Sequence, residues 1–289
     1  MQSVLPASQP GRRGALNWIL VLLLPLLMVV MELGVAAMEP RVLSLRNIVN
    51  ILDQSSYLAV FAGAQMVVIL TRGFDLSLGA SVSAVSVASA MVMTSLADAN
   101  APAWVVVIMG LGTGLGFGAL VGLFNGLFIS WMRINPFVVT LGSLNICMGL
   151  ASTMSGGRPV FNVPDSFSHL LYDGKLVPGL PLPLPLTLAI LVCVLLYFLL
   201  DHTIFGRSLY LIGNSPRAAH LAGLPSRFYL TMAYIVCGML AAFGGLMLTA
   251  RTSSGEPNLG GSLMLESIAA AVIGGVSLQG GVGGIVPVI

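Results

Sequence analysis

Long stretches without any charged residue are the feature that most constrains the fold of this chain. Eight occur, each at least about as long as the ~17–25 residues that a helix needs to cross the hydrocarbon core of a bilayer. Period-two alternation of polar and apolar residues, typical of a membrane barrel, is absent. The sequence therefore predicts an all-α polytopic membrane protein, a helical bundle with a single transmembrane domain over residues 1–289. The stretches are residues 14–31, 54–71, 76–97, 99–132, 134–157, 176–200, 228–250 and 267–289.

Charges and turn residues around these stretches give approximate boundaries for the helices. The connections at 71–75 and 132–135 are very short, so the segments that they join should form antiparallel hairpins. The connection at 155–181 contains four prolines and is expected to be irregular. We expect spanning segments at residues 16–37, 48–71, 76–96, 103–131, 136–154, 182–200, 228–250 and 263–278.

Basic residues set the expected orientation in the membrane. Arg12 and Arg13 precede the first apolar segment, which predicts a cytoplasmic N-terminal tail over residues 1–15. Val35-Ala36-Ala37 resembles the cleavage site of a signal peptide, so removal of the first segment is the alternative. Alternation from a cytoplasmic N-terminus places seven of the twelve basic residues, and a polar loop at 201–227, in the cytoplasm. The cytoplasmic basic residues are Arg12, Arg13, Arg72, Arg133, Arg207, Arg217 and Arg227. The basic residues expected on the outer side are Arg41, Arg46, Arg158, Lys175 and Arg251.

The loop at 201–227 is a polar island between two long apolar stretches, with three arginines and two histidines. Ser215 is suited to the N-cap of a short helix, and Pro216 fits its first position, where a missing N–H costs nothing. Gly223 can adopt the left-handed conformation that ends a helix, and Pro225 prevents continuation. The spacing predicts a basic helix of about two turns. Such an element at a membrane surface is best explained as a contact for another protein.

Glycine recurs at every fourth position along the fourth segment, so that these glycines share one helical face. In lipid, small residues allow two helix backbones to approach closely, which predicts a central place for this helix in the bundle. Static packing and sliding of a neighbouring helix are both compatible with the pattern. The stripe consists of Gly110, Gly114, Gly118, Gly122 and Gly126.

Sequence motifs of enzymes are missing. The chain has no zinc-protease motif, no nucleophile elbow and no plausible nucleophile–base pair, and its only lysine, Lys175, is not in a phosphate-binding loop. Cys147, Cys193 and Cys237 lie in separate apolar stretches, which indicates buried small side chains instead of a disulfide or metal site. We therefore expect no catalytic residue, metal, cofactor or nucleic-acid partner, and any dependence on ATP must come from another subunit.

Polar residues recur at helical spacing at the outer end of the second segment. They form either a polar lining at the mouth of a permeation path or a helix start hydrated at the interface. Asp53 and Glu266 lie toward the outer ends of their segments, which weighs against an ion-coupled carrier with a carboxylate at the bilayer midplane. The candidate path residues are Asn50, Asp53, Gln54, Tyr57 and Glu266.

Other polar residues in the apolar segments have structural explanations. Asp75 is a natural N-cap for the third segment, and its charge suits the positive end of the helix dipole. Asn135-Pro136 is a turn that opens the fifth segment. Asn125 and Asn145 are deeper amides, for which hydrogen bonding between helices is expected rather than contact with a solute.

Four motifs in order resemble the membrane permease of binding-protein-dependent ABC importers, in the ribose-type sugar branch. T-R-G-F-D-L-S-L-G-A at 71–80 is similar to that family's G-G-I-D-L-S-V-G-S, and N-P-F-V-V-T-L-G-S at 135–143 is similar to P-F-I-V-T-L-G. F-G-R-S-L-Y-L-I-G-N-S-P-R-A-A-H-L-A-G at 205–223 resembles F-G-R-x-x-Y-A-I-G-x-N-x-x-A-A-x-L-x-G. I-A-A-A-V-I-G-G-V-S-L-Q-G-G at 268–281 matches I-A-A-V-V-I-G-G-T-S-L-x-G-G almost throughout.

The resemblance implies a non-enzymatic permease subunit in the bacterial inner membrane. It implies a cytoplasmic ABC ATPase, a periplasmic sugar-binding protein and a second copy of the chain as partners, and a monosaccharide or small polyol as solute. An ion-coupled carrier of a small polar solute is the alternative. The family usually has about ten spanning segments, so the eight found here indicate a chain truncated at its C-terminal end.

The resemblance also assigns roles to residues. Segment 215–223 becomes the coupling helix that docks on the ATPase. Arg72 stands where the family has glycine, which implies an added contact with a phosphate or a partner. Met264 stands where the family often has a carboxylate ahead of the one matched by Glu266. The residues implied in coupling are Gly206, Arg207, Asn214, Ser215, Pro216, Arg217, Ala218, Ala219 and Gly223.

Overall fold

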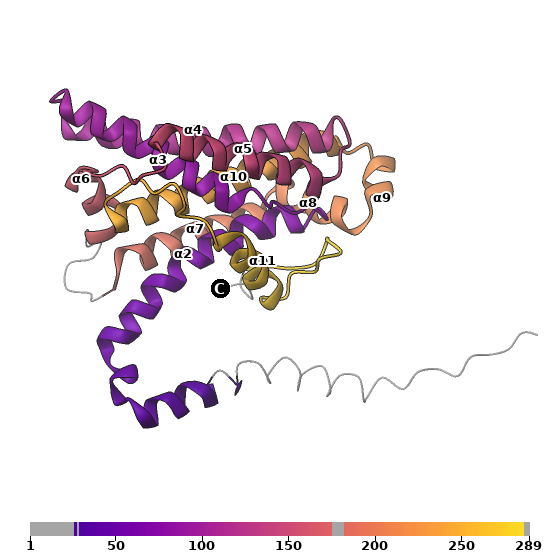
Figure 1. The fold of residues 1–289 in the computed structure, drawn as a ribbon. Helices are drawn as coiled ribbons and strands as arrows, with labels where there is room; N and C mark the ends of the chain where they lie inside the picture. Colours follow the sequence, from indigo (N-terminus) through magenta and orange to yellow (C-terminus); the bar gives the residue numbers. More distant parts are fainter. Residues whose placement is uncertain (1–25, 28, 175–181, 286–289) are drawn as a thin grey trace, which may run out of the picture. The chain divides into compact units, whose positions relative to one another are not determined.

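The fold is known from a computed structural model that describes residues 26–27, 29–174 and 182–285. These residues form helices joined by turns, with one isolated bridge between Val160 and Gly255 and no strand (Figure 1). The all-α prediction is therefore confirmed for the described residues. The chain divides into two compact units, Met1–Ile51 and Leu52–Ile289, which are described separately. The predicted tail at 1–15 lies outside the described residues.

The first unit contains a short apolar helix, Val29–Met38, and a 3-10 turn, η1 (Pro40–Leu43). The first residues of α2 (Leu45–Ile69) follow. Glu39 begins η1, with its carboxylate accepting a hydrogen bond from the Arg41 amide. The Asn47 side chain donates to the Val42 carbonyl at 2.8 Å and so joins η1 to the start of α2.

The second unit is built around α10, which packs most extensively against α4 and also against α3. α3 in turn contacts α4 and α5 (Figure 1). Tyr234, Phe61 and Leu246 are fully buried in this core. The helices are α3 (Leu78–Asp98), α4 (Ala103–Ser130), α5 (Pro136–Ser155), α6 (Asp165–Ser168), η2 (His169–Asp173), α7 (Leu184–His202), α8 (Ile204–Asn214), α9 (Pro216–Leu221), α10 (Ser226–Thr252) and α11 (Leu263–Ile273).

Five of these helices, α3, α4, α5, α7 and α10, are long and apolar enough to cross a membrane. α2 has 25 residues but carries Asp53, Gln54 and Gln65 and is not one of the five. α11 has only 11 residues, fewer than the ~17–25 that a spanning helix needs, so the expected span at 263–278 is wrong in extent. The segment expected at 16–37 lies largely outside the described residues.

Two connections contain more helix than the sequence predicted. The region at 155–181 was expected to be irregular, but its described part forms α6 and the π-helical turn η2. The polar island forms α8 in addition to the short helix α9. α8 is amphipathic: it buries Leu209 and Ile212, whereas its one charged residue, Arg207, is exposed. The hairpin expected of the fourth and fifth segments is confirmed, because α4 and α5 are joined by five residues and pack together.

The glycine stripe of α4 lies where α4 approaches its neighbours. A Cβ added at Gly118 would lie 2.3 Å from the Gly238 carbonyl oxygen, and one at Gly122 would lie 2.2 Å from that of Tyr234. Both carbonyls belong to α10. By contrast, a Cβ at Gly112 or Gly116, on another face of α4, would meet nothing within 4 Å. Backbone contact with α10 therefore requires glycine at the middle of the stripe.

Candidate functional site

The short helix α9 begins and ends where its sequence predicted. The Ser215 hydroxyl accepts a hydrogen bond from the Ala218 amide at 3.2 Å, and Pro216 occupies the first position. Gly223 follows the helix with a φ of 71°, and the Leu224 amide donates to the Ala219 carbonyl at 3.0 Å. The predicted caps are confirmed. Arg217, Ala218 and His220 are exposed, whereas Ala219 is buried. α9 therefore presents a basic face.

The helix before it, α8, anchors α9 to the bundle through two glycines. A Cβ at Gly206 would lie 1.9 Å from the Leu200 carbonyl oxygen, and one at Gly213 would lie 1.9 Å from that of Leu70. Thr203 begins α8, with its hydroxyl accepting from the Gly206 amide at 3.3 Å. The two glycines therefore allow α8 to lie against the ends of α7 and α2, directly before the start of α9.

Arg72 binds the C-terminal end of α8. Its Nε donates to the Gly213 carbonyl at 2.7 Å and its Nη2 to the Asn214 carbonyl at 3.0 Å. Carbonyls at this end of a helix lack partners within the helix and attract cations. Arg72 therefore contacts this chain itself, and the phosphate or partner contact expected of it stays a prediction. Arg72 also has a φ of 67°, the left-handed conformation in which glycine, the family's residue, is unstrained.

A third segment, the turn at 276–284, joins the same cluster. The Gly281 amide donates to the Leu70 carbonyl at 2.9 Å, and the Asn214 side chain donates to the Gly281 carbonyl at 3.0 Å. The Tyr210 hydroxyl donates to the Gly283 carbonyl at 2.9 Å. Burial and, second, the nearby Asp201 carboxylate raise the pKa of Tyr210, so this hydroxyl keeps its proton at neutral pH. The turn after α2, the end of α8 and the turn at 276–284 are therefore one hydrogen-bonded cluster next to α9.

Asp75 is fully buried within the bundle and does not act as a simple N-cap. It accepts hydrogen bonds from the amide of Ser77 at 2.9 Å and from its hydroxyl at 2.5 Å, and Ser77 is the residue directly before α3. The Asn125 side chain donates to Ser77 Oγ at 3.0 Å and accepts from the Ser143 hydroxyl. Cys237 Sγ lies 3.9 Å from the other Asp75 oxygen. This polar cluster joins the start of α3 to α4, α5 and α10.

The two deep amides behave differently. Asn125 bonds to residues of other elements, as predicted. Asn145 is exposed and donates to the Leu141 carbonyl of its own helix at 2.8 Å, so the expectation of a hydrogen bond between helices is wrong there. The sequence reasoning treated both as equivalent because periodicity alone does not say which face of α5 is covered.

The candidate path residues are only partly brought together. Asp53 is paired with Arg251 at 3.6 Å and accepts from the Tyr57 hydroxyl at 3.3 Å. The Arg251 guanidinium also lies 5.5 Å from the centre of the Tyr57 ring. Gln54 and Glu266 are exposed and make no hydrogen bond to this group among the described residues. Asn50 is an exposed residue of the first unit, and its position relative to the others is not described.

Sequence reasoning missed Arg251 as the partner of Asp53. Its signal in the sequence was its place at the outer end of an otherwise uncharged stretch, where an unpaired guanidinium is costly. Met264, the other departure from the family pattern, lies in the first turn of α11, ahead of Glu266, and its backbone carbonyl accepts from the Ser267 hydroxyl at 2.9 Å.

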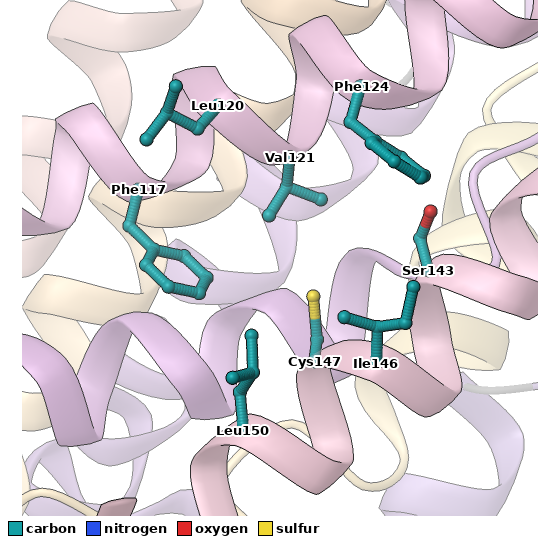
Figure 2. A pocket seen from close by; sticks show the side chains of 8 residues that line it. All are labelled: Phe117, Leu120, Val121, Phe124, Ser143, Ile146, Cys147 and Leu150. Atoms are coloured by element: carbon teal, nitrogen blue, oxygen red, sulfur yellow. The ribbon is translucent and has the colours of Figure 1, made fainter.

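An apolar groove of about 230 Å³ lies between α4 and α5. Figure 2 shows its side chains pointing toward one another from the two helices, with Ser143 as the polar residue at one end. Because Ser143 already bonds to Asn125, the groove offers few hydrogen bonds to a polar solute. The lining residues are Phe117, Leu120, Val121, Phe124, Ser143, Ile146, Cys147 and Leu150.

Comparison with known proteins identifies the family. Residues 47–288 match the family described as "Branched-chain amino acid transport system / permease component". The chain belongs to this family. The match includes α9, the Arg72 cluster and the buried Asp75 cluster.

Proteins similar to this chain are named as permeases. The galactose/methyl galactoside import permease protein MglC of Haemophilus influenzae is 32% identical over 285 residues, which cover 96% of this chain and 82% of that protein. The ribose import permease protein RbsC of Bacillus subtilis is 34% identical over 252 residues, covering 87% and 75%. A probable ABC transporter permease, y4mJ of Sinorhizobium fredii, is 34% identical over 255 residues, covering 88% and 73%. No solved structure matches the chain.

These matches confirm the resemblance inferred from the motifs. The chain is a multi-pass protein of the bacterial inner membrane and a permease component of the ATP-binding-cassette type, which is not itself an enzyme.

Proposed function

We propose that this chain is the membrane-spanning subunit of an importer for a monosaccharide or a small polyol. The observation that carries the proposal is its similarity, over most of its length, to permeases named for galactose and for ribose. The family description names branched-chain amino acids, but the relatives named here for a solute are named for sugars. The two sugars differ in ring size and substituents, so the proposal extends to the class and not to one sugar.

In this proposal α9 is the coupling helix, which docks on a separate cytoplasmic ATPase. Three features support it: its exposed basic face, its caps, and its attachment to the bundle through α8. Residues 206–223 include all the residues assigned to coupling. Gly206 and Gly213 set the position of α8, Asn214 bonds to the turn at 276–284, and Arg217 and Ala218 lie on the exposed face of α9.

The proposed mechanism is alternating access by a pair of permease chains. ATP binding closes the ATPase dimer and moves α9, and the hydrogen-bonded cluster around Arg72 carries that movement to the ends of α2 and α8. A periplasmic binding protein delivers the sugar and supplies most of the selectivity. The glycine contacts between α4 and α10 are the proposed place where helices slide. The candidate path residues, Asp53 and Tyr57 among them, form the outer mouth of the permeation path.

The experiment that tests this function is affinity purification of the full-length protein from its native membranes, followed by mass spectrometry of the bound proteins. We expect an ATPase in stoichiometric amounts and sugar uptake in vesicles that requires ATP. An ion-coupled carrier predicts the opposite: no ATPase, and uptake driven by an ion gradient with this chain alone. That result would replace the proposal and would direct attention to the buried Asp75 carboxylate as the coupling group.

A further inference from the structure

A second cavity, of about 640 Å³, lies beside α9. Its wall is formed mainly by the end of α4 and the turn that follows, by α9, and by the start of α10 with the turn before it; Thr71 and Ile212 complete it. α4 and α10 are both long and apolar enough to span the membrane, and the cavity lies at the ends that the arginine distribution places in the cytoplasm. This orientation predicts that the cavity lies at the level of the lipid head groups.

The charged groups that line this cavity are all of one sign. These groups are Arg133 and Arg227; the imidazole of His220 also lines the cavity, and no carboxylate belongs to its described lining. Neither arginine forms an ion pair with a carboxylate or donates a side-chain hydrogen bond within the described part of the chain. The Arg227 guanidinium instead lies 5.4 Å from the centre of the Trp131 ring. The site is therefore complementary to an anion.

Apart from the hydroxyl residues Thr71, Ser130 and Ser226, the remaining wall of the cavity is apolar. Ile129 and Leu230 come from the membrane helices, and Phe228 and Trp131 are more than half exposed. The hydrogen bond between the Ser130 and Thr231 hydroxyls, at 2.7 Å, ties α4 to α10 beside them. Aromatic residues at the end of a membrane helix are typical of the interface between head groups and hydrocarbon. The cavity thus combines a cationic region with an apolar region, at the depth where a lipid has its phosphate and the start of its acyl chains.

We propose that this cavity binds the head group of an anionic phospholipid of the cytoplasmic leaflet, with its phosphodiester between Arg133 and Arg227 and an acyl chain along Phe228. Basic pockets between membrane helices on the cytoplasmic side are known to hold such head groups. A free phosphate would use the guanidinium groups but not the apolar wall, and an acidic segment of the ATPase would approach α9 from the cytoplasm instead of along α10. Since α9 forms part of the same cavity, a bound lipid would also hold α9 in place.

The test uses the full-length protein in nanodiscs of phosphatidylcholine that contain a small fraction of phosphatidylglycerol. Lipid that remains with the protein after re-extraction is measured by mass spectrometry. We expect phosphatidylglycerol to be enriched over its fraction in the disc. Two basic groups near a surface correspond to about a thirtyfold change in affinity, so the double variant R133Q/R227Q should lose the enrichment. The matched control R46Q/R158Q removes the same charge from residues expected on the outer side and should keep it.

Each other outcome overturns the proposal. Equal recovery of the two lipids by the wild-type protein would show that the cavity does not select an anion, and this arm does not depend on the variants folding. Displacement of phosphatidylglycerol by inorganic phosphate would assign the site to a soluble anion. A double variant that keeps the lipid but no longer retains the ATPase would assign the cavity to the protein partner. The lipid measurement needs no transport activity, so its result is independent of the proposed import function.

Discussion

Arg72 combines an unfavourable backbone conformation with favourable side-chain contacts. A non-glycine residue with a φ of 67° is strained by about 1 kcal/mol. The two hydrogen bonds from its guanidinium to the end of α8 offset this strain, since each contributes about 1 kcal/mol of net stability. The side-chain contacts therefore offset the backbone strain, although glycine would suit the backbone better.

Replacement of Arg72 separates these two effects. Arg72→Ala keeps the strain and loses both hydrogen bonds, whereas Arg72→Gly loses the bonds but relieves the strain. We expect Arg72→Ala to lower the free energy of unfolding by about 2 kcal/mol relative to the wild type. Arg72→Gly should lower it by only about 1 kcal/mol, because relief of the strain offsets part of the loss. Thermal unfolding of the purified protein in detergent, monitored by size-exclusion chromatography, checks the order. Equal stability of the two variants would show that the backbone at this turn relaxes without cost.

At the scale of elements, the contact between α4 and α10 depends on backbone approach at glycine. α4 provides its own control, because its glycines lie on two faces. A Cβ at Gly118 would lie 2.3 Å from the Gly238 carbonyl oxygen, whereas one at Gly112 would meet nothing within 4 Å. Glycine to alanine at an open helical position is neutral or stabilising by up to about 1 kcal/mol.

We therefore expect Gly118→Ala to destabilise the protein by about 1–3 kcal/mol, because α4 and α10 must separate to admit the methyl group. Gly112→Ala should leave stability unchanged or raise it slightly. Yield, monodispersity and thermal stability in detergent measure the difference. Sugar uptake then separates packing from sliding: a Gly118→Ala protein that is stable but does not transport would favour a moving contact over a static one.

The elements that sequence predicted well are those specified by neighbouring residues. The caps of α9 follow from Ser215, Pro216 and Gly223 within nine residues, and the membrane helices follow from long uncharged stretches. α8 was missed because its stability depends on close approach of Gly206 and Gly213 to backbone that is distant in sequence or in an adjacent helix. No local pattern records such contacts.

The same reason explains the errors at single residues. Asp75 precedes a helix and fits the pattern of an N-cap, but its burial depends on Asn125 and Cys237, which lie 50 and 162 residues away. Likewise, the bonds of Arg72 to Gly213 and Asn214 span 141 and 142 residues, so the sequence did not indicate them. Sequence therefore identified which polar residues were unusual but not what they contact.

At the scale of the whole molecule, import requires that events at an ATPase reach the membrane helices through α9. Arg217 is exposed on α9 and contributes to its basic face, but it makes no side-chain hydrogen bond or ion pair among the described residues. Its replacement should therefore leave the fold intact and affect only a surface contact. This makes it a cleaner probe of coupling than Ala219, which is buried.

We expect the Arg217→Glu protein to insert into the membrane normally and to match the wild type in thermal stability. It should lose both ATP-dependent uptake and the binding of the ATPase. Reversing a charge at a contact between proteins places like charges together, which costs several kcal/mol when the partner's groove is acidic. Arg158→Glu reverses a charge in the loop after α5, expected on the opposite side of the membrane, and should retain both activities. Full uptake by Arg217→Glu, with the ATPase still bound, would remove α9 from the coupling surface. Because the proposed lipid site uses Arg133 and Arg227 on the adjacent wall, Arg217→Glu should leave phosphatidylglycerol enrichment unchanged, so the two surfaces around α9 can be told apart in one set of variants.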